Sequence, residues 1–381
     1  MKSTIYTEDH DSFREMAREF LAKEVVPHFP DWETAGLVPR EVFNQIGDLG
    51  VLGIQVPEEY GGAGSDSFLY SAVWAEETAR AYVNLGGLSV HMNVVLPYFL
   101  AYCSEEQKRR WFPGLACGEL MTSIAMTEPG TGSDLAGMTT SATRQGEHFV
   151  LNGAKTFISG GINADLVVVV ARTGRGENRR DGLSLLVVER DMVGFTRGRN
   201  LDKIGLKTQD TAELFFEDVR VPVANLLGEE GKAFSYLTSN LPQERLGIAV
   251  GAQAAAEAAL TTTLEYVRER KVFGTTVSAF QNTKFELAAC AIDIEAGRSF
   301  LDRALAEHEA GELSSADAAK VKVFCTEVQD RVIDRCLQLH GGYGYMREYP
   351  IARLYADARV TRIFGGTTEV LKTIVAKSLD L

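Results

Sequence analysis

The sequence predicts an α+β protein with an N-terminal α-helical domain, a middle β-barrel or β-sandwich domain and a C-terminal four-helix bundle. Apolar residues recur at helical spacing over residues 1–122, at alternate positions over 123–231, and at helical spacing again over 232–381. A chain of 381 residues is long enough for two or three domains with substantial cores.

Helical patterning begins near the N-terminus, where DSFREMAREFLAKEVV places its apolar residues near one face of a helix. Pro39 is expected to open a short helix that ends near Gly50. The stretches YSAVWAEETARAY and SVHMNVVLPYFLAY predict two further helices. Ser104 and Gln107 have the spacing of a capping box for the next helix.

The middle region has the alternating pattern of strands. Within HFVLNGAKTFISGG, the pair Asn152-Gly153 is typical of a two-residue hairpin turn. Strands are predicted at ADLVVVVART, LSLLVVERD and AELFFEDVRVP. Residues 243–270 are then rich in Ala and Gly, which suits close packing between helices. Further helices of a bundle are predicted near 279–310, 314–340 and 350–380.

Composition argues against several classes of function. The net charge of −13 disfavours nucleic acid or an anionic membrane surface as a partner. The longest apolar run, Leu166 to Ala171, is too short to cross a bilayer, and the N-terminus lacks the apolar segment of a secretory signal. Five scattered cysteines, with no CxxC pair and no histidine at zinc spacing, indicate reduced thiols and no metal site. A cytoplasmic protein is therefore expected.

The segment Ile124 to Gly137, IAMTEPGTGSDLAG, places three glycines beside serine and threonine. Their spacing is GxGxxxxG rather than the dinucleotide-binding GxGxxG, and no βαβ unit surrounds them. Composition alone leaves two interpretations. The segment is either a polar loop that leads into the β domain, or a loop whose N–H groups and hydroxyls bind a flavin and a polar ligand.

Several motifs, taken in chain order, resemble those of the acyl-CoA dehydrogenase family. TEPGTGSD closely matches the family signature, and RKVFG, QLHGGYGY and IFGGTTEV resemble its flavin-binding segments. LPQERL and GLKTQDTAELFFEDVRVP are most similar to the long-chain branch. The resemblance covers essentially the whole chain. It implies the family fold, an FAD cofactor, a homotetramer and α,β-dehydrogenation of a fatty acyl-CoA to the trans-2-enoyl-CoA in fatty acid β-oxidation.

The resemblance also implies which residues contact FAD. Phe157 stands where many relatives carry tryptophan, which keeps an aromatic face beside the isoalloxazine ring. Arg270 can pair bidentately with the pyrophosphate of a neighbouring subunit's FAD, although an arginine after a helix is by itself more often a solvated charge. His340 occupies a position that usually packs. The implied contacts are Ile124, Met126, Thr127, Gly132, Ser133, Phe157, Ile158, Ser159, Arg270, Phe273, Gln281, Gln338, Leu339, Gly341, Gly342, Thr367, Thr368 and Glu369.

The catalytic base is implied in the same way. In most of the family the place of Gly365 carries the glutamate that takes the substrate α-proton, while the β-hydrogen leaves as hydride to flavin N5. In the long-chain and isovaleryl branches the base matches Glu244, within LPQERL. A lone helical glutamate is more often a solvated charge, but here Gly365 is simultaneously empty in its own motif. The Gly365 N–H is then expected to donate to the thioester carbonyl.

Substrate identity stays more open. The resemblance implies acyl-thioester contacts from Ser133, Pro242, Gln243, Arg245 and Gly366. The acyl group can ride on CoA or on a carrier protein, and it can be long or short and branched. A member of a different class, a flavin-binding scaffold or oxygen-using flavoprotein, is the remaining alternative. An electron transfer flavoprotein is the acceptor that the resemblance implies.

Overall fold

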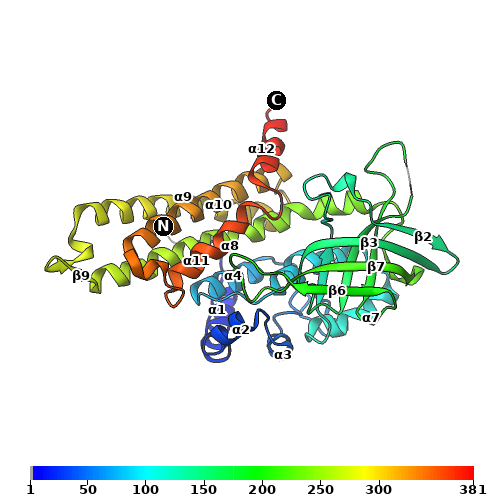
Figure 1. Ribbon diagram of the computed structural model, residues 1–381, viewed down its shortest axis with the longest axis horizontal. Helices are drawn as coiled ribbons and strands as arrows, with labels where there is room; N and C mark the ends of the chain where they lie inside the picture. The colour runs from blue at the N-terminus through cyan, green and yellow to red at the C-terminus, as the bar shows by residue number, and fades with distance from the viewer. Residues whose placement is uncertain (1–2, 175) are drawn as a thin grey trace.

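The computed structural model of the chain describes residues 3–174 and 176–381. The large sheet lies at one end of the long axis, and the tip that carries β9 (Lys271–Val272) lies at the other (Figure 1). Helices occupy the chain up to Ala116, the strands of the large sheet lie between Thr122 and Leu227, and helices return at Ala233. This order confirms the predicted α+β fold.

Local chemistry sets the ends of several N-terminal helices. Pro39 caps α3, as predicted. The Gln107 N–H donates to Ser104 Oγ at 3.2 Å, and the Ser104 N–H donates to Gln107 Oε1 at 2.9 Å, so the predicted capping box is present. The elements are α1 (Glu8–Phe20), η1 (Leu21–Val25), α2 (Phe29–Ala35), α3 (Arg40–Asp48), η2 (Glu58–Tyr60), α4 (Leu69–Arg80), α5 (Leu88–Val90), η3 (His91–Val95), α6 (Leu96–Tyr102) and α7 (Glu105–Ala116).

Eight of the described strands form one sheet in the order β6-β7-β3-β2-β4-β5-β8, with β1 paired parallel to β4, and β9 pairs with β10 (Thr275–Thr276) in a separate two-stranded sheet. The strands are β1 (Thr122–Ala125), β2 (Ser141–Gln145), β3 (His148–Ser159), β4 (Leu166–Arg172), β5 (Leu183–Glu189), β6 (Phe195–Asn200), β7 (Thr211–Pro222) and β8 (Leu226–Leu227). Strands β4 and β5 are buried over nearly their whole length, which explains their unbroken apolar sequences.

The predicted hairpin turn at Asn152-Gly153 is wrong. Strand β3 includes both residues of this pair and continues beyond them. The chain turns between β2 and β3 at Gly146 and Glu147 instead. Gly153 lies at a β-bulge, where the register between β3 and β7 shifts and φ is +148°. Long pairing with β7 therefore overrides the local turn preference of the dipeptide.

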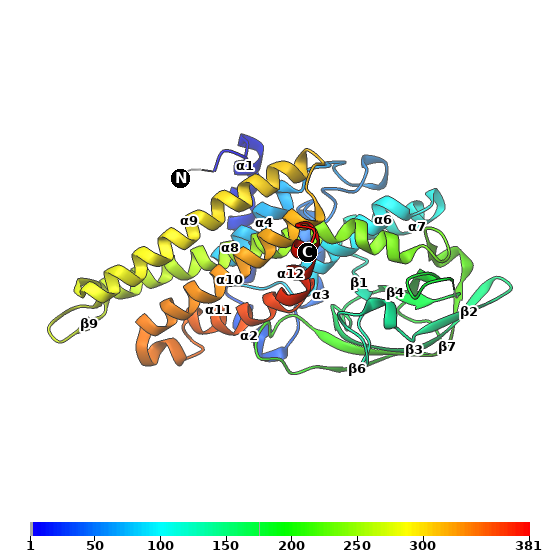
Figure 2. The ribbon, with the colours of Figure 1, turned by 90° about the horizontal axis from the view of Figure 1, so that it is seen from above.

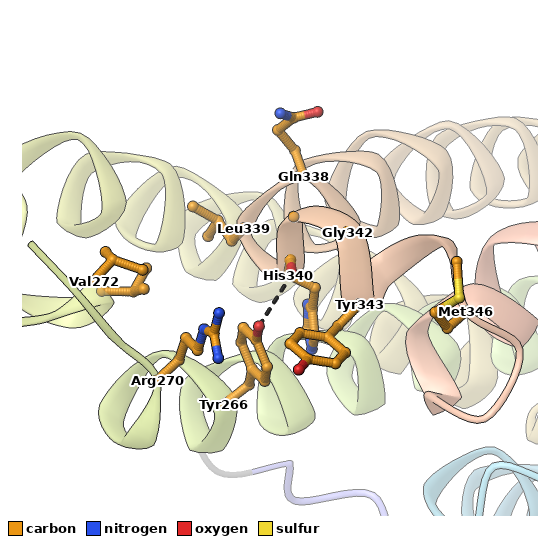
Figure 3. A pocket seen from close by; sticks show the side chains of 11 residues that line it. Tyr266, Arg270, Val272, Gln338, Leu339, His340, Gly342, Tyr343 and Met346 are labelled. Carbon is orange, nitrogen blue, oxygen red and sulfur yellow. Dashed lines mark hydrogen bonds between the residues drawn. The ribbon is translucent and has the colours of Figure 1, made fainter.

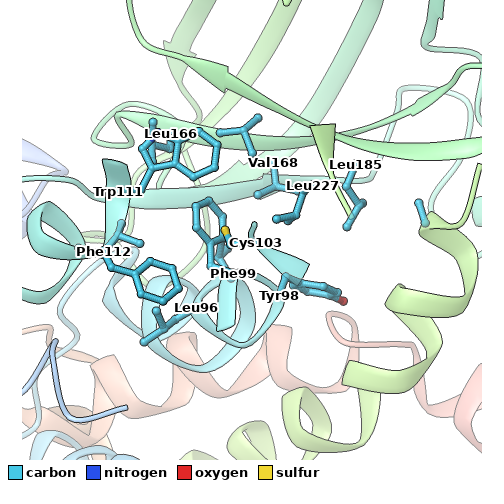
Figure 4. Packing of buried hydrophobic residues seen from close by; sticks show 14 of the residues in the cluster. Leu96, Tyr98, Phe99, Cys103, Trp111, Phe112, Leu166, Val168, Leu185 and Leu227 are labelled. Atoms are coloured by element: carbon cyan, nitrogen blue, oxygen red, sulfur yellow. The ribbon is translucent and has the colours of Figure 1, made fainter. Parts of the chain in front are cut away.

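The N-terminal helices and the sheet share one hydrophobic core. Phe99 of α6 and Trp111 of α7 lie against Leu166 and Val168 of β4 (Figure 4). These side chains are essentially inaccessible to solvent. This packing fixes the position of α6 against the sheet. It therefore also fixes Tyr98 of α6, which contacts α8.

The C-terminal region is built on one long helix, α8 (Ala233–Glu269), which lies beside α9 (Gln281–Glu309) and α10 (Ser315–His340) (Figure 2). Its many buried alanines allow these close contacts, as the composition suggested. Arg298 of α9 bonds Glu76 of α4 at 2.7 Å and Glu257 of α8 at 2.9 Å. This ion-pair network ties three helices together across their interface.

The helix expected over 350–380 is instead two helices, α11 (Pro350–Ala358) and α12 (Thr368–Lys377), which are separated by a 3₁₀ turn, η8 (Arg359–Arg362), and a loop. Gly365 and Gly366 in this loop have φ values of +62° and +97°. Such left-handed backbone ends a helix and is tolerated best by glycine.

Two further expectations concern the whole chain. All five cysteines are free, and four of them are buried, as expected for reduced thiols. Among the described residues, no helix combines the length and apolar character needed to cross a membrane.

We expect Gly153→Ala to lower the free energy of unfolding by about 1–3 kcal/mol, because a Cβ at this position would lie 2.5 Å from Thr140 Oγ1. Thermal unfolding followed by circular dichroism measures the change. Gly146→Ala is the matched control, since Gly146 also has positive φ but no protein atom within 4 Å of an added Cβ. Equal melting temperatures for the two variants would show that contact with Thr140 is unimportant.

Candidate active site

A cavity of about 410 Å³ lies where α4, α8 and α11 meet β1 and β3. Eight residues singled out from the sequence line it, although they come from four distant segments of the chain. They are Ile124, Met126, Thr127, Phe157, Ile158, Ser159, Glu244 and Gly365. The structure therefore brings the expected base, the expected carbonyl donor and part of the expected flavin site together.

Glu244 lies on α8 and is 8% exposed. Its Oε1 accepts hydrogen bonds from the Tyr98 hydroxyl at 3.0 Å and from the Asn240 amide at 3.2 Å. Its Oε2 has no hydrogen bond to another described residue. Burial raises the pKa of Glu244 to about 7, and the hydrogen bonds from Tyr98 and Asn240 and the charge of Arg245 oppose that rise. One carboxylate oxygen is thus held and the other is free.

Gly365 lies on the wall formed by α8 and the loop before α12. A Cβ at Gly365 would come within 2.3 Å of Ile248 Cδ1, so a side chain here requires Ile248 to move. Ile248 follows Glu244 by four residues on α8, and residues four apart lie on the same face of a helix. Glu244 and Gly365 therefore lie near each other in the lining of the cavity.

Phe157 contributes an aromatic ring to the lining of the cavity. It lies at a bulge of β3, has a φ of +59° that is rare for a bulky residue, and is 68% exposed. Beside it, the Ser159 hydroxyl accepts a hydrogen bond of 2.9 Å from the Gln209 amide. A planar flavin ring fits this wall, since it would cover the exposed ring and meet the polar groups of Ser159 and Gln209.

A buried ion pair holds the signature loop TEPGTGSD against β3. Glu128 accepts from the N–H groups of Thr139 and Thr140, at 2.7 and 2.8 Å, and pairs with Lys155 at 2.9 Å. Although burial opposes it, these bonds hold the pKa of Glu128 at about 2. Gly132 and Ser133 lie further along, are both exposed, and do not line the cavity.

A second cavity, of about 400 Å³, lies at the far tip of the C-terminal helices. It is lined by Arg270, Gln338, Leu339, Gly341 and Gly342, all expected flavin contacts. The Arg270 guanidinium lies over the ring of Tyr343. The Gln338 side chain points away from Arg270 and Tyr343 (Figure 3). Added Cβ atoms at the two glycines would meet open space, so their backbone is accessible to a ligand.

His340 in this second cavity is a packing residue, as expected. Its ring stacks on Tyr266, with centroids 4.3 Å apart, and its Nδ1 lies 2.9 Å from the Cys336 carbonyl oxygen. The Tyr266 hydroxyl donates to the His340 carbonyl at 3.1 Å (Figure 3). Burial lowers the pKa of His340, although the hydrogen bond with the Cys336 carbonyl opposes that shift.

The two cavities cannot serve one cofactor within a single chain. Glu244 lies on α8, and Arg270 directly follows the end of this helix. At about 1.5 Å per residue, the two are separated by about 39 Å along the helix axis. Phe273, which is 96% exposed, and Gln281, which begins α9, lie near Arg270 and do not line either cavity.

Other expected substrate and cofactor residues lie around the first cavity without lining it. Arg245 is buried and donates to Ser315 at 3.1 Å, and Gln243 donates to the Asn93 carbonyl at 3.5 Å. Pro242 is half-buried within α8, and Gly366 lies in the loop beside Gly365. Thr367 caps α12, Thr368 is buried behind it, and Glu369 is exposed.

Sequence reasoning missed Tyr98, Asn240, Gln209 and Lys322. Asn240 could have been found, because it precedes Glu244 by one helical turn. The others reach the site from α6, the segment before β7, and α10, so only the tertiary fold brings them there.

The fold and the two cavities are those expected of a flavin-dependent oxidoreductase. Three models of one family match the chain: "Acyl-CoA dehydrogenase, N-terminal domain" at residues 7–119, "middle domain" at 123–219 and "C-terminal domain" at 231–379. The long-chain specific mitochondrial acyl-CoA dehydrogenase of Sus scrofa is 48% identical over 376 residues, which are 98% of this chain and 87% of that protein.

Solved structures agree with this match. An acyl-CoA dehydrogenase from Geobacillus kaustophilus has a TM-score of 0.98 and 49% identity, with 100% of both chains covered. Butyryl-CoA dehydrogenase from Megasphaera elsdenii has a TM-score of 0.92 and 34% identity, with 99% of both chains covered. The chain belongs to the acyl-CoA dehydrogenase family, and is thus an oxidoreductase with FAD as its cofactor.

We expect Tyr98→Phe to move the acidic limb of the kcat/KM profile for acyl-CoA oxidation upward by about one pH unit. The Tyr98 hydroxyl stabilises the carboxylate form of Glu244, so its loss raises a pKa that is already about 7. Tyr102→Phe is the matched control, because the Tyr102 hydroxyl bonds Ser239 instead. An unchanged limb in Tyr98→Phe would contradict the assignment of that limb to Glu244.

Proposed function

We propose that the protein oxidises long-chain fatty acyl-CoA to the trans-2-enoyl-CoA, with Glu244 as the base that takes the α-proton. The observation that carries this proposal is a buried carboxylate, with one oxygen free, in the same apolar cavity as Gly365 and Phe157. A base near neutral pKa is suited to removing a weakly acidic C–H proton at physiological pH.

Each residue has a distinct task in this proposal. Tyr98 and Asn240 fix one oxygen of Glu244, which leaves the other to approach the α-carbon. The Gly365 N–H donates to the thioester carbonyl, where negative charge develops as the proton leaves. Phe157 and Ser159 border the cofactor. FAD supplies the acceptor for the hydride from the β-carbon.

A long acyl chain is supported by the small residues along the cavity. Ala75 and Ala79 of α4 face Gly247, Gly251 and Ala255 of α8 around the same space. An added Cβ at Gly251 would meet no protein atom within 4 Å, so this part of the helix leaves room. The relatives that are about half identical include enzymes named for long-chain substrates, which agrees with this choice.

Partners follow from the same geometry. Because Arg270 is remote from Glu244 within one chain, we propose that the second cavity receives the FAD of a neighbouring subunit in a homotetramer. An electron transfer flavoprotein is the proposed acceptor, by analogy with the family. We propose that the acyl group of the substrate is carried by CoA and not by a carrier protein. Turnover measured with the same acyl group on CoA and on a carrier protein decides between the two.

We expect Glu244→Gln to retain FAD but to lose acyl-CoA oxidation by at least about 10²-fold, the low end for removal of a general base. Turnover with an artificial electron acceptor, together with bound-flavin absorbance, measures both properties. The variant should also melt no lower than the wild type at pH 8, because the wild type must then ionise a buried carboxyl group. Near-normal turnover would exclude Glu244 as the base.

We expect Gly251→Leu to reduce kcat/KM for long acyl chains by about tenfold or more and to leave short chains less affected. The leucine side chain would extend into the cavity without displacing protein atoms first. A series of straight-chain acyl-CoA substrates measures the change in preference. Thr261→Leu on the exposed side of α8 is the control, and a uniform loss at every chain length would contradict the proposed acyl path.

A further inference from the structure

We propose that Lys322 is a positioning residue that aims and strengthens the Gly365 N–H as the donor to the substrate's thioester carbonyl. This inference rests on the proposed dehydrogenase function. Lys322 lies on α10 and its side chain is fully buried. Its ammonium group donates to the Phe364 carbonyl at 3.0 Å and to the Gly366 carbonyl at 2.8 Å.

The direction of the Gly365 N–H follows from peptide geometry. The Phe364 carbonyl and the Gly365 N–H belong to one planar trans peptide unit, so they point in opposite directions. Lys322 draws that carbonyl toward α10 and thereby turns the N–H away from α10. Gly365 lines the cavity, and its N–H makes no hydrogen bond to another described residue. The donor is therefore available to a ligand in the cavity.

The loop needs an external anchor to hold this orientation. Gly365 and Gly366 both have positive φ, and glycine peptides rotate more freely than others. Lys322 bonds the carbonyls of Phe364 and Gly366, the residues before and after Gly365. Rotation of the peptide unit that contains either carbonyl would therefore break a charge-assisted hydrogen bond. One side chain thus fixes the 364–365 and 366–367 peptide units, which flank the unit between Gly365 and Gly366.

Charge gives Lys322 a second effect. A cation at the carbonyl end of a peptide polarises the unit and makes its N–H a stronger donor. Among the described residues, no carboxylate forms a salt bridge with Lys322, so its charge acts on the loop without being neutralised nearby. Burial and the charge of Arg245 lower the pKa of Lys322 to about 8, which leaves most of the group protonated at pH 7.

Placement beneath the substrate carbonyl makes this charge useful in the reaction. Negative charge develops on the thioester oxygen as Glu244 takes the α-proton, and a preorganised donor stabilises it. A merely structural lysine would hold the loop without changing how strongly a bound carbonyl is polarised. The polarisation of that carbonyl is therefore the property that separates the two roles.

The test uses the FAD-bound enzyme and a trans-2-enoyl-CoA labelled with ¹³C at the thioester carbonyl. Infrared difference spectra measure how far binding lowers the carbonyl stretching frequency. We expect K322M to lose a large part of the wild-type shift and K322Q, which keeps a neutral donor, to lose less. We also expect kcat of K322M to fall by about tenfold or more with little change in enoyl-CoA affinity. Because the donor is weakened and not removed, the fall should not exceed the roughly 10²–10³-fold loss that follows removal of such a donor.

Lys320→Met is the matched control, because Lys320 lies on the same helix but pairs with Asp317 at the surface. A wild-type carbonyl shift in both Lys322 variants would overturn the proposal, even if kcat falls, because the role would then be structural. K322Q decides the matter if K322M loses FAD. If the wild type itself neither oxidises acyl-CoA nor shifts the carbonyl band, the proposed function fails first, and this proposal fails with it.

Discussion

Close packing of α8 against α4, α9 and α10 is the constraint on which the rest of the structure depends. Its buried alanines let the helices approach, and Arg298 adds ion pairs that join α4, α8 and α9. The same helix carries Glu244 beside the sheet and leads to Arg270 at the far tip. One helix therefore sets both the position of Glu244, the proposed base, and its distance from the second cavity.

Glu244 combines two opposing demands. Burial favours its neutral form and gives it a pKa close to neutrality, while Tyr98 and Asn240 favour the carboxylate. A fully solvated glutamate would be a weaker base, and a buried one without these donors would stay protonated. The site therefore uses partial compensation, in which only one carboxylate oxygen is satisfied by the protein.

The sequence was most informative where structure is local or where motifs occur in a fixed order. Ser104 and Gln107 predicted a capping box correctly, and the ordered motifs placed Glu244 and Gly365 in one site. Asn152-Gly153 misled because pairing with β7 is a long-range contact that a dipeptide preference does not contain. Tyr98 and Lys322 were not predictable for the same reason, since neither adjoins a motif and both act across helix interfaces.

The contact between Ile248 and the space above Gly365 bears on how such enzymes diverge. A carboxylate cannot be added at 365 while Ile248 keeps its place, and the left-handed backbone there disfavours any side chain. If both carboxylates were present, their like charges would raise the pKa of one of them and impair it as a base. Transfer of the proposed base from position 244 to position 365 thus requires two substitutions together with movement of the Ile248 side chain. The position of the proposed base is therefore tied to the side chain at 248 as well as to the residues at 244 and 365.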